Sequence, residues 1–198
     1  ITALQHALDG ESILFVGAGF SIGAKNIQGQ SLKSGPKLAE LLCSEASLSD
    51  VTRLEDAAED FIDIFGSDRL INLLQNQFSV HSVADYHIDL ANISWKRIYT
   101  TNYDNVLETA YQRAGKRLTT VSLSNNIRDI VKGHTICVHL NGCISNLDRE
   151  SVLHEIKLTD SSYLTSIVSE SEWASLFRQD LSSQGQFFLL VILWLTLI

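Results

Sequence analysis

Apolar residues along this chain fall into two patterns, short continuous runs and longer segments with three- and four-residue spacing. A continuous run, typical of a strand buried on both faces of a sheet, occupies residues 12–16, and further strand-like segments lie at 97–101, 118–123 and 135–140. Helical spacing occupies residues 2–9, 37–44, 51–93 and 105–114. Because strands and helices alternate, the pattern predicts an α/β fold built on a doubly wound parallel sheet. The helical stretch over about residues 37–93 is expected to form an inserted lobe.

Composition narrows the class of protein. The chain has 198 residues, of which 45% are hydrophobic and 19% charged, and this suits a single soluble domain. Its net charge is −8 and its basic residues are scattered, so we expect neither nucleic-acid binding nor association with a membrane. The apolar tail at 187–198 is shorter than the roughly 20 residues that a membrane-spanning helix needs, and it predicts a buried strand.

The three cysteines, Cys43, Cys137 and Cys143, form no C-x-x-C pair. The ligands of a zinc ribbon are therefore lacking, and the histidines show no metal-ligand spacing. An odd number of unpaired thiols in an α/β chain is typical of a reducing compartment. We expect a cytoplasmic protein that holds no metal, with Cys137 as a small core residue.

Polar motifs directly follow three of the predicted strands. These motifs are Gly17-Ala-Gly-Phe-Ser21, Thr100-Thr-Asn-Tyr-Asp104 and His139-Leu-Asn-Gly142. In doubly wound sheets, ligands bind outside the carboxyl ends of the strands, and motifs at those ends converge there. The sequence therefore predicts one shared ligand site at this edge of the sheet.

The glycine motif allows the backbone to approach a diphosphate and to present N–H groups to it. A dinucleotide fingerprint of the G-x-G-x-x-G type would need glycine at position 22, where Ile22 stands, and no P-loop lysine follows. A tight strand-to-helix turn without a ligand explains this motif equally well.

The two later motifs also have structural explanations. Asp104 or Asn102 can cap the following helix, but a cap needs only one such residue and leaves the two threonines unexplained. His139 can be a structural histidine, and the Asn-Gly pair after it is an ordinary turn signal. Strand alternation places His139 and Asn141 on the same face, so His139 becomes a candidate base at the shared site.

The three motifs, in this order, resemble the sirtuin-like domains of bacterial anti-phage defence proteins. Segments 35–42, 157–163 and 173–177 resemble further blocks of that family, so the resemblance covers about residues 12–181. It implies a Rossmann-like fold, NAD as the substrate and no metal. It also implies that homo-oligomerisation, or a partner protein of the defence system or the phage, activates the domain.

The resemblance also assigns roles to individual residues. Asn102 would orient the attacking water beside the nicotinamide ribose, and His139 would act as general base at the ribose hydroxyls. Asp104 would border the nicotinamide, and the backbone of the glycine motif would hold the diphosphate. The residues implied to bind NAD are Gly17, Ala18, Gly19, Ser21, Thr101, Asp104 and Asn141.

Three features depart from the family pattern. Family members commonly carry His immediately before the glycine of the third motif, where this chain has Asn141, so either His139 or Asn141 occupies the position of the base. The paired-cysteine zinc module of sirtuin deacylases is lacking, which favours NAD hydrolysis over protein deacylation. After about residue 185, another apolar sequence replaces the family's strand ending in Gly-Tyr-Ser. We expect a frame change to have altered this end of a single domain over residues 1–198.

The sequence therefore predicts an NAD glycohydrolase of anti-phage defence that releases nicotinamide and ADP-ribose. Departure of the cationic nicotinamide needs orientation and charge placement rather than a strong nucleophile, and the three motifs carry residue types that supply both. The alternative is a module that binds NAD or ADP-ribose derivatives as a sensor or scaffold, without turnover.

Overall fold

The structure, a computed structural model, describes residues 9–48, 53–149, 171–182 and 187–190. A five-stranded sheet in the order β5–β6–β4–β1–β7 forms its centre, and β2 and β3 form a separate two-stranded sheet. The elements in chain order are β1 (Ile13–Val16), the 3₁₀ turn η1 (Ala18–Ser21), β2 (Lys25–Asn26), α2 (Gly35–Glu45), α3 (Leu54–Phe65), α4 (Ser67–Phe78), β3 (Val80–Ser82), α5 (Asp85–Asn92), β4 (Arg97–Thr100), α6 (Val106–Arg113), β5 (Leu118–Ser122), η2 (Ile127–Asp129), β6 (Thr135–His139), η3 (Ile144–Asn146), α10 (Glu172–Ser182) and β7 (Phe187–Leu190).

Every strand pair in the five-stranded sheet is parallel. The four strands predicted from apolar runs are confirmed as β1, β4, β5 and β6, and the start of the apolar tail forms β7 beside β1. On β1, Leu14 and Val16 pack on one face of the sheet and Ile13 on the other. Full burial of each such side chain contributes about 1.5–3 kcal/mol. This burial on both faces explains why β1 contains no polar residue.

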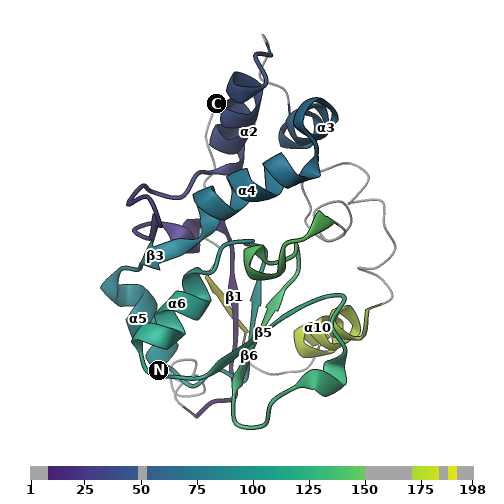
Figure 1. The fold of residues 1–198 in the computed structure, drawn as a ribbon. Helices are drawn as coiled ribbons and strands as arrows, with labels where there is room; N and C mark the ends of the chain where they lie inside the picture. The colour runs from purple at the N-terminus through teal and green to yellow at the C-terminus, as the bar shows by residue number, and fades with distance from the viewer. Residues whose placement is uncertain (1–8, 49–52, 150–170, 183–186, 191–198) are drawn as a thin grey trace.

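Helices cover both faces of the sheet, as Figure 1 shows with α5 and α6 on one side and α10 on the other. The first face packs Val106 and Ala110 of α6 against the sheet, and the second packs the fully buried Trp173 of α10 against β4 and β6. The predicted α/β fold with a doubly wound parallel sheet of Rossmann-like arrangement is therefore confirmed.

The inserted lobe consists of α2, α3 and α4, which share a core of their own that includes Leu38, Phe61 and Leu74. Figure 1 shows these helices grouped beyond one end of the sheet. The last part of the predicted lobe behaves differently, because α5 packs against α6 over the sheet. Gly66, whose φ of 80° suits glycine, separates α3 from α4.

The sequence pattern misplaces two element boundaries. It predicts helix throughout 51–93, but Val80–Ser82 forms β3, which pairs antiparallel with β2. The Val80 N–H donates to Oδ1 of Asn105 (2.7 Å), a partner 25 residues away that no local pattern reveals. The helix predicted at 37–44 begins earlier than expected, because α2 starts at Gly35 with Pro36 in its first turn, where no N–H donor is needed.

Several sequence predictions concern residues outside the described ones. These are the helix at 2–9 up to residue 8, the segment 157–163 and the tail beyond residue 190.

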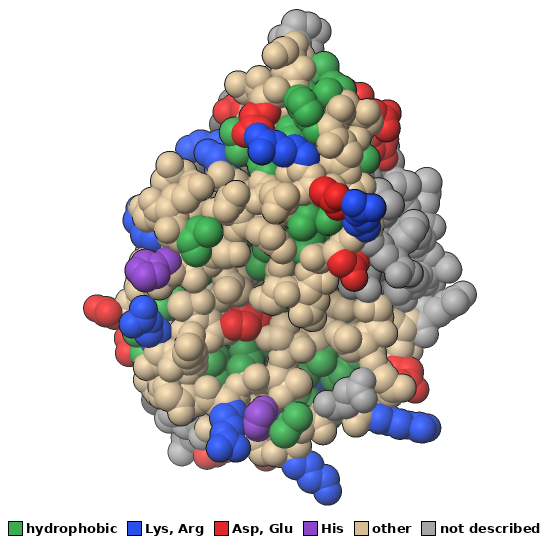
Figure 2. All heavy atoms as spheres, in the orientation of Figure 1, with side chains coloured by type: hydrophobic (Ala, Val, Ile, Leu, Met, Phe, Trp, Pro, Cys, Tyr) green, Lys and Arg blue, Asp and Glu red, His purple; other side chains and the backbone are tan. Residues whose placement is uncertain are grey.

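Among the residues that the structure describes, no helix has the length and apolar character needed to span a bilayer. Lys and Arg side chains are spread over the face seen in Figure 2 and do not gather in one patch.

Candidate functional site

The three polar motifs meet at the carboxyl ends of adjacent strands β1, β4 and β6. Backbone hydrogen bonds continue past the strand ends and fix this convergence. The Thr101 N–H donates to the carbonyl of Val16 (3.2 Å), and the Leu140 N–H donates to the carbonyl of Thr100 (2.8 Å). The predicted common location of the motifs is therefore present in the structure.

A cavity of about 500 Å³ opens between these strand ends and the helical lobe. Its strand side is formed by Ala18, Ser21, segment 101–104 and Asn141. The opposite side is formed by segment 31–38, which leads into α2, and by Phe78 at the end of α4. The cavity is large enough for a substantial part of a nucleotide ligand.

Asn102 is the central polar residue of this cavity, and only 8% of it is exposed. Its amide nitrogen donates to the carbonyl of Gly17 (3.0 Å) and to Oγ of Ser21 (2.9 Å). Both amide hydrogens are therefore used, which fixes the orientation of the group and leaves Oδ1 as an acceptor for a ligand or water. The first two motifs are thus connected directly through this side chain.

Asp104 places a buried carboxylate in the cavity. Oδ2 accepts a hydrogen bond from Oγ of Ser21 (2.6 Å), and Oδ1 accepts one from the Val106 N–H (3.1 Å) at the start of α6. Burial raises the pKa of Asp104 above its ordinary value, and the bonds from Ser21 and Val106 only partly oppose this rise. Within the described residues, no Lys or Arg forms an ion pair with this carboxylate.

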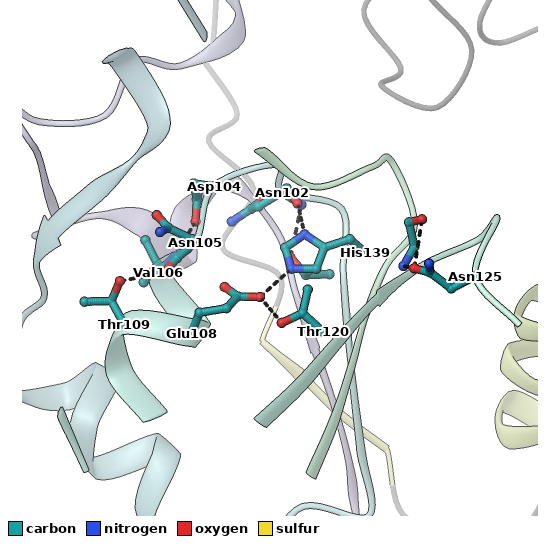
Figure 3. A network of polar contacts seen from close by, with 11 residues as sticks. Asn102, Asp104, Asn105, Val106, Glu108, Thr109, Thr120, Asn125 and His139 are labelled. Atoms are coloured by element: carbon teal, nitrogen blue, oxygen red, sulfur yellow. Dashed lines mark hydrogen bonds and ion pairs between the residues drawn. The ribbon is translucent and has the colours of Figure 1, made fainter. Parts of the chain in front are cut away.

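His139 is fully buried and does not line the cavity. Nδ1 lies 2.8 Å from the carbonyl oxygen of Asn102, and Nε2 lies 3.0 Å from Oε1 of Glu108, as the dashed lines of Figure 3 mark. Because a carbonyl oxygen only accepts, Nδ1 carries a proton and donates it to Asn102. Neither ring nitrogen is free to take a proton from a ligand in this arrangement.

The charge state of His139 depends on its neighbours. Burial lowers the pKa of His139, but Cys137, Cys143 and Glu108 together outweigh burial and raise the pKa well above its usual value. Burial also raises the pKa of the Cys137 thiol to about 11, so this thiol is neutral near pH 7. Glu108 is therefore the anion that stabilises a protonated His139, and the hydrogen bond from His139 lowers the pKa of Glu108 against the effect of burial.

The remaining predicted site residues divide into two groups. Thr101 and Asn141 line the cavity together, and Nδ2 of Asn141 donates to the carbonyl of Thr101 (3.0 Å). Gly17 and Gly19 lie behind the cavity wall, where the Gly17 carbonyl positions Asn102. His139 and Asn141 do not share an environment, because β6 ends at His139 and strand alternation does not extend to residue 141.

Sequence reasoning missed two sets of residues around this site. Segment 31–37, with Lys33 and Lys37, forms one wall of the cavity although its sequence is that of an ordinary loop. Glu108 binds His139 from α6, and Thr120 of β5 donates to the same carboxylate oxygen (2.6 Å). No local sequence signal singles out Glu108, because its partners His139 and Thr120 lie on strands that follow later in the chain.

One group of side chains around His139 has the composition of a metal site. Single ligand atoms of Glu108, Cys137 and His139 all lie within 4.8 Å of one another. The sequence-based expectation of no metal, which rested on the lack of paired cysteines, remains a prediction.

Comparison with known proteins covers the second half of the chain. Residues 96–190 match the model of a family described as SIR2-like domain, a range that runs from the start of β4 through β7 and includes Asn102, Asp104 and His139. A search of curated proteins gave no match. The glycine motif lies outside the matched range, and only the geometry of the strand ends connects it to the matched residues. The match supports a sirtuin-like family, and with it an NAD-related function, for this chain.

Proposed function

We propose that the cavity binds NAD and that the chain hydrolyses the bond between nicotinamide and ribose. One observation carries the proposal beyond the family match. Asp104 is a buried carboxylate beside Asn102 in a ligand-sized cavity, without a Lys or Arg ion-pair partner among the described residues. A buried carboxylate without an ion-pair partner is costly, and a cationic ligand reduces that cost.

The nicotinamide ring of NAD is such a cation. With the ring next to Asp104, the carboxylate stabilises the bound substrate, and Ser21 keeps the carboxylate in place through its 2.6 Å hydrogen bond. Cleavage makes nicotinamide neutral and moves the positive charge to the ribose, as an oxocarbenium-like centre. A fixed carboxylate and amide then stabilise the charge where it develops, with no strong nucleophile required.

Asn102 is suited to orient the water that attacks this centre. Its two amide hydrogens are bound to Gly17 and Ser21, so Oδ1 has a fixed direction and accepts a hydrogen bond from the water. Orientation of this kind supplies much of the rate enhancement in such reactions. His139 can take the predicted role of base only after it loses a proton and its Nε2 releases Glu108.

The diphosphate of NAD would lie between Ala18 on the strand side of the cavity and Lys33 and Lys37 on the opposite side. Lys33 and Lys37 add a countercharge that the glycine motif lacks.

We further propose that the activity serves anti-phage defence in the cytoplasm. Uncontrolled loss of NAD would kill the host, so the proposal includes activation by homo-oligomerisation or by a defence or phage protein. The proposed domain interacts with NAD and its activator and has no direct contact with nucleic acid or membrane.

The proposed hydrolysis is tested by nicotinamide release from NAD, with and without neighbouring gene products. We expect Asn102→Ala to reduce release by at least about a hundredfold. The control is Asn92→Ala, which changes an exposed asparagine at the end of α5 and should leave the rate unchanged. Far-ultraviolet circular dichroism should show that both variants are folded. Full activity in Asn102→Ala would refute the assignment.

A second candidate function is NAD or ADP-ribose binding without turnover. The observation in its favour is that both ring nitrogens of His139 are engaged and His139 lies outside the cavity lining. Calorimetric binding of NAD with no nicotinamide release under any trigger would select this function over hydrolysis.

A further inference from the structure

Three residues with different metal-binding groups lie together next to Asn102. They are Cys137 and His139 of β6 and Glu108 of α6. Cys137 and His139 are two positions apart on β6, so they face the same side of the sheet. Glu108 reaches them from α6, which covers this side, and the three ligand atoms lie within 4.8 Å of one another. Both Cys137 and His139 are fully buried.

The hydrogen bonds of His139 follow the pattern of a metal-binding histidine. Such a residue usually donates its second ring N–H to a carboxylate or a backbone carbonyl, which fixes the tautomer and directs the other nitrogen to the metal. Here Nδ1 donates to the carbonyl of Asn102 (2.8 Å), and Nε2 points to the carboxylate of Glu108 (3.0 Å).

The two carboxylate oxygens of Glu108 differ in their contacts. Oε1 accepts from Thr120 and contacts His139, whereas Oε2 is buried and has no hydrogen-bond partner among the described residues. A buried carboxylate oxygen without a partner is costly, and such an oxygen needs an explanation. A cation bound to it would provide one.

We propose that Glu108, Cys137 and His139 bind a divalent transition-metal ion, with Zn²⁺ as the preferred ion. The mixed set of carboxylate oxygen, thiolate sulfur and imidazole nitrogen is typical of zinc, and harder ions such as Mg²⁺ avoid thiolate.

The ligands balance the charge of the ion. Metal binds the thiolate of Cys137, the neutral imidazole of His139 and the carboxylate of Glu108, and around Zn²⁺ these three groups give a net charge of zero. The buried site can therefore hold the ion without an uncompensated charge.

The ion would reach the site from the side of Glu108, whose side chain is 22% exposed while that of His139 is not exposed. Once bound, it would fix the His139 ring and, through Nδ1–H, the backbone of Asn102. This inference does not depend on NAD hydrolysis, because metal binding can be measured on its own.

The test is a titration of the untagged, metal-stripped full chain with Co²⁺, followed by competition with Zn²⁺. We expect one equivalent of Co²⁺ to produce the near-ultraviolet absorption of thiolate-to-cobalt charge transfer, and Zn²⁺ to abolish it. Binding should also release protons at neutral pH, because metal binds deprotonated ligands, and a pH indicator in weak buffer measures this release.

Cys137→Ser should lose the absorption, whereas Cys43→Ser should keep it. Cys43 is an equally buried free thiol in the helical lobe and so controls for the cost of a buried hydroxyl. A wild-type chain that shows no saturable thiolate absorption would overturn the proposal, whichever variants fold. So would an absorption that Cys137→Ser retains.

Discussion

At the scale of single residues, Asp104 is a buried acid whose contribution to stability depends on pH. Its carboxylate is buried beside Asn102 and Ser21, and burial raises its pKa. The native state therefore holds a proton on Asp104 more tightly than the unfolded chain does. Protonated Asp104 therefore stabilises the fold at pH values below its ordinary pKa of 3.8. This stabilisation is lost as the pH rises through the higher pKa that Asp104 has in the folded state.

Replacement of Asp104 by Asn removes this pH-dependent penalty. The difference in free energy of unfolding, Asp104→Asn minus wild type, should become more positive as the pH rises from below 4 to neutral, because only the wild type develops a buried charge. Urea unfolding at a series of pH values measures the difference. A difference that stays constant with pH would show that burial does not penalise the Asp104 carboxylate.

At the scale of elements, a buried ion-pair cluster joins β4 to α10. Asp180 of α10 is 3% exposed, pairs with Arg97 and Lys96, and accepts a hydrogen bond from the hydroxyl of Tyr99 (2.7 Å). Burial raises the pKa of Tyr99, and its bond to Asp180 raises it further, so the phenol remains a donor. This cluster holds the second helical layer against the sheet.

Asp180→Asn should destabilise the fold by about 3 kcal/mol, because it leaves the partly buried charge of Arg97 without its partner. Asp63→Asn, on the exposed side of α3, should change stability by less than about 0.5 kcal/mol. Urea unfolding at pH 7 measures both. Equal effects of the two substitutions would mean that the Asp180 cluster stabilises the fold no more than an exposed carboxylate does.

Elements with strong local patterns were predictable, and those set by distant partners were not. The apolar run of β1 predicted its strand because burial on both faces favours apolar residues, and the central residues 136–138 of β6 follow the same pattern. β3 was predicted as helix because its pairing with β2 and its bond to Asn105 come from residues far away in sequence.

At the scale of the whole molecule, the site combines segments that the sequence keeps far apart. The convergence of the three motifs was predictable, because the carboxyl ends of parallel strands share one edge. The facing wall at 31–38 and Phe78 was not, because it depends on how the helical lobe packs over that edge. The position of His139 behind the cavity likewise follows from Glu108, a partner 31 residues away.

The central claim is that this cavity receives the nicotinamide end of NAD against Asp104. It is tested most directly by calorimetric titration of NAD into the wild type, Asp104→Asn and the control Asp63→Asn. We predict saturable one-to-one binding that Asp104→Asn weakens by at least about tenfold, equivalent to about 1.4 kcal/mol, and that Asp63→Asn leaves unchanged. Wild-type binding that Asp104→Asn leaves equally tight, or no saturable binding by the wild type, would contradict the account.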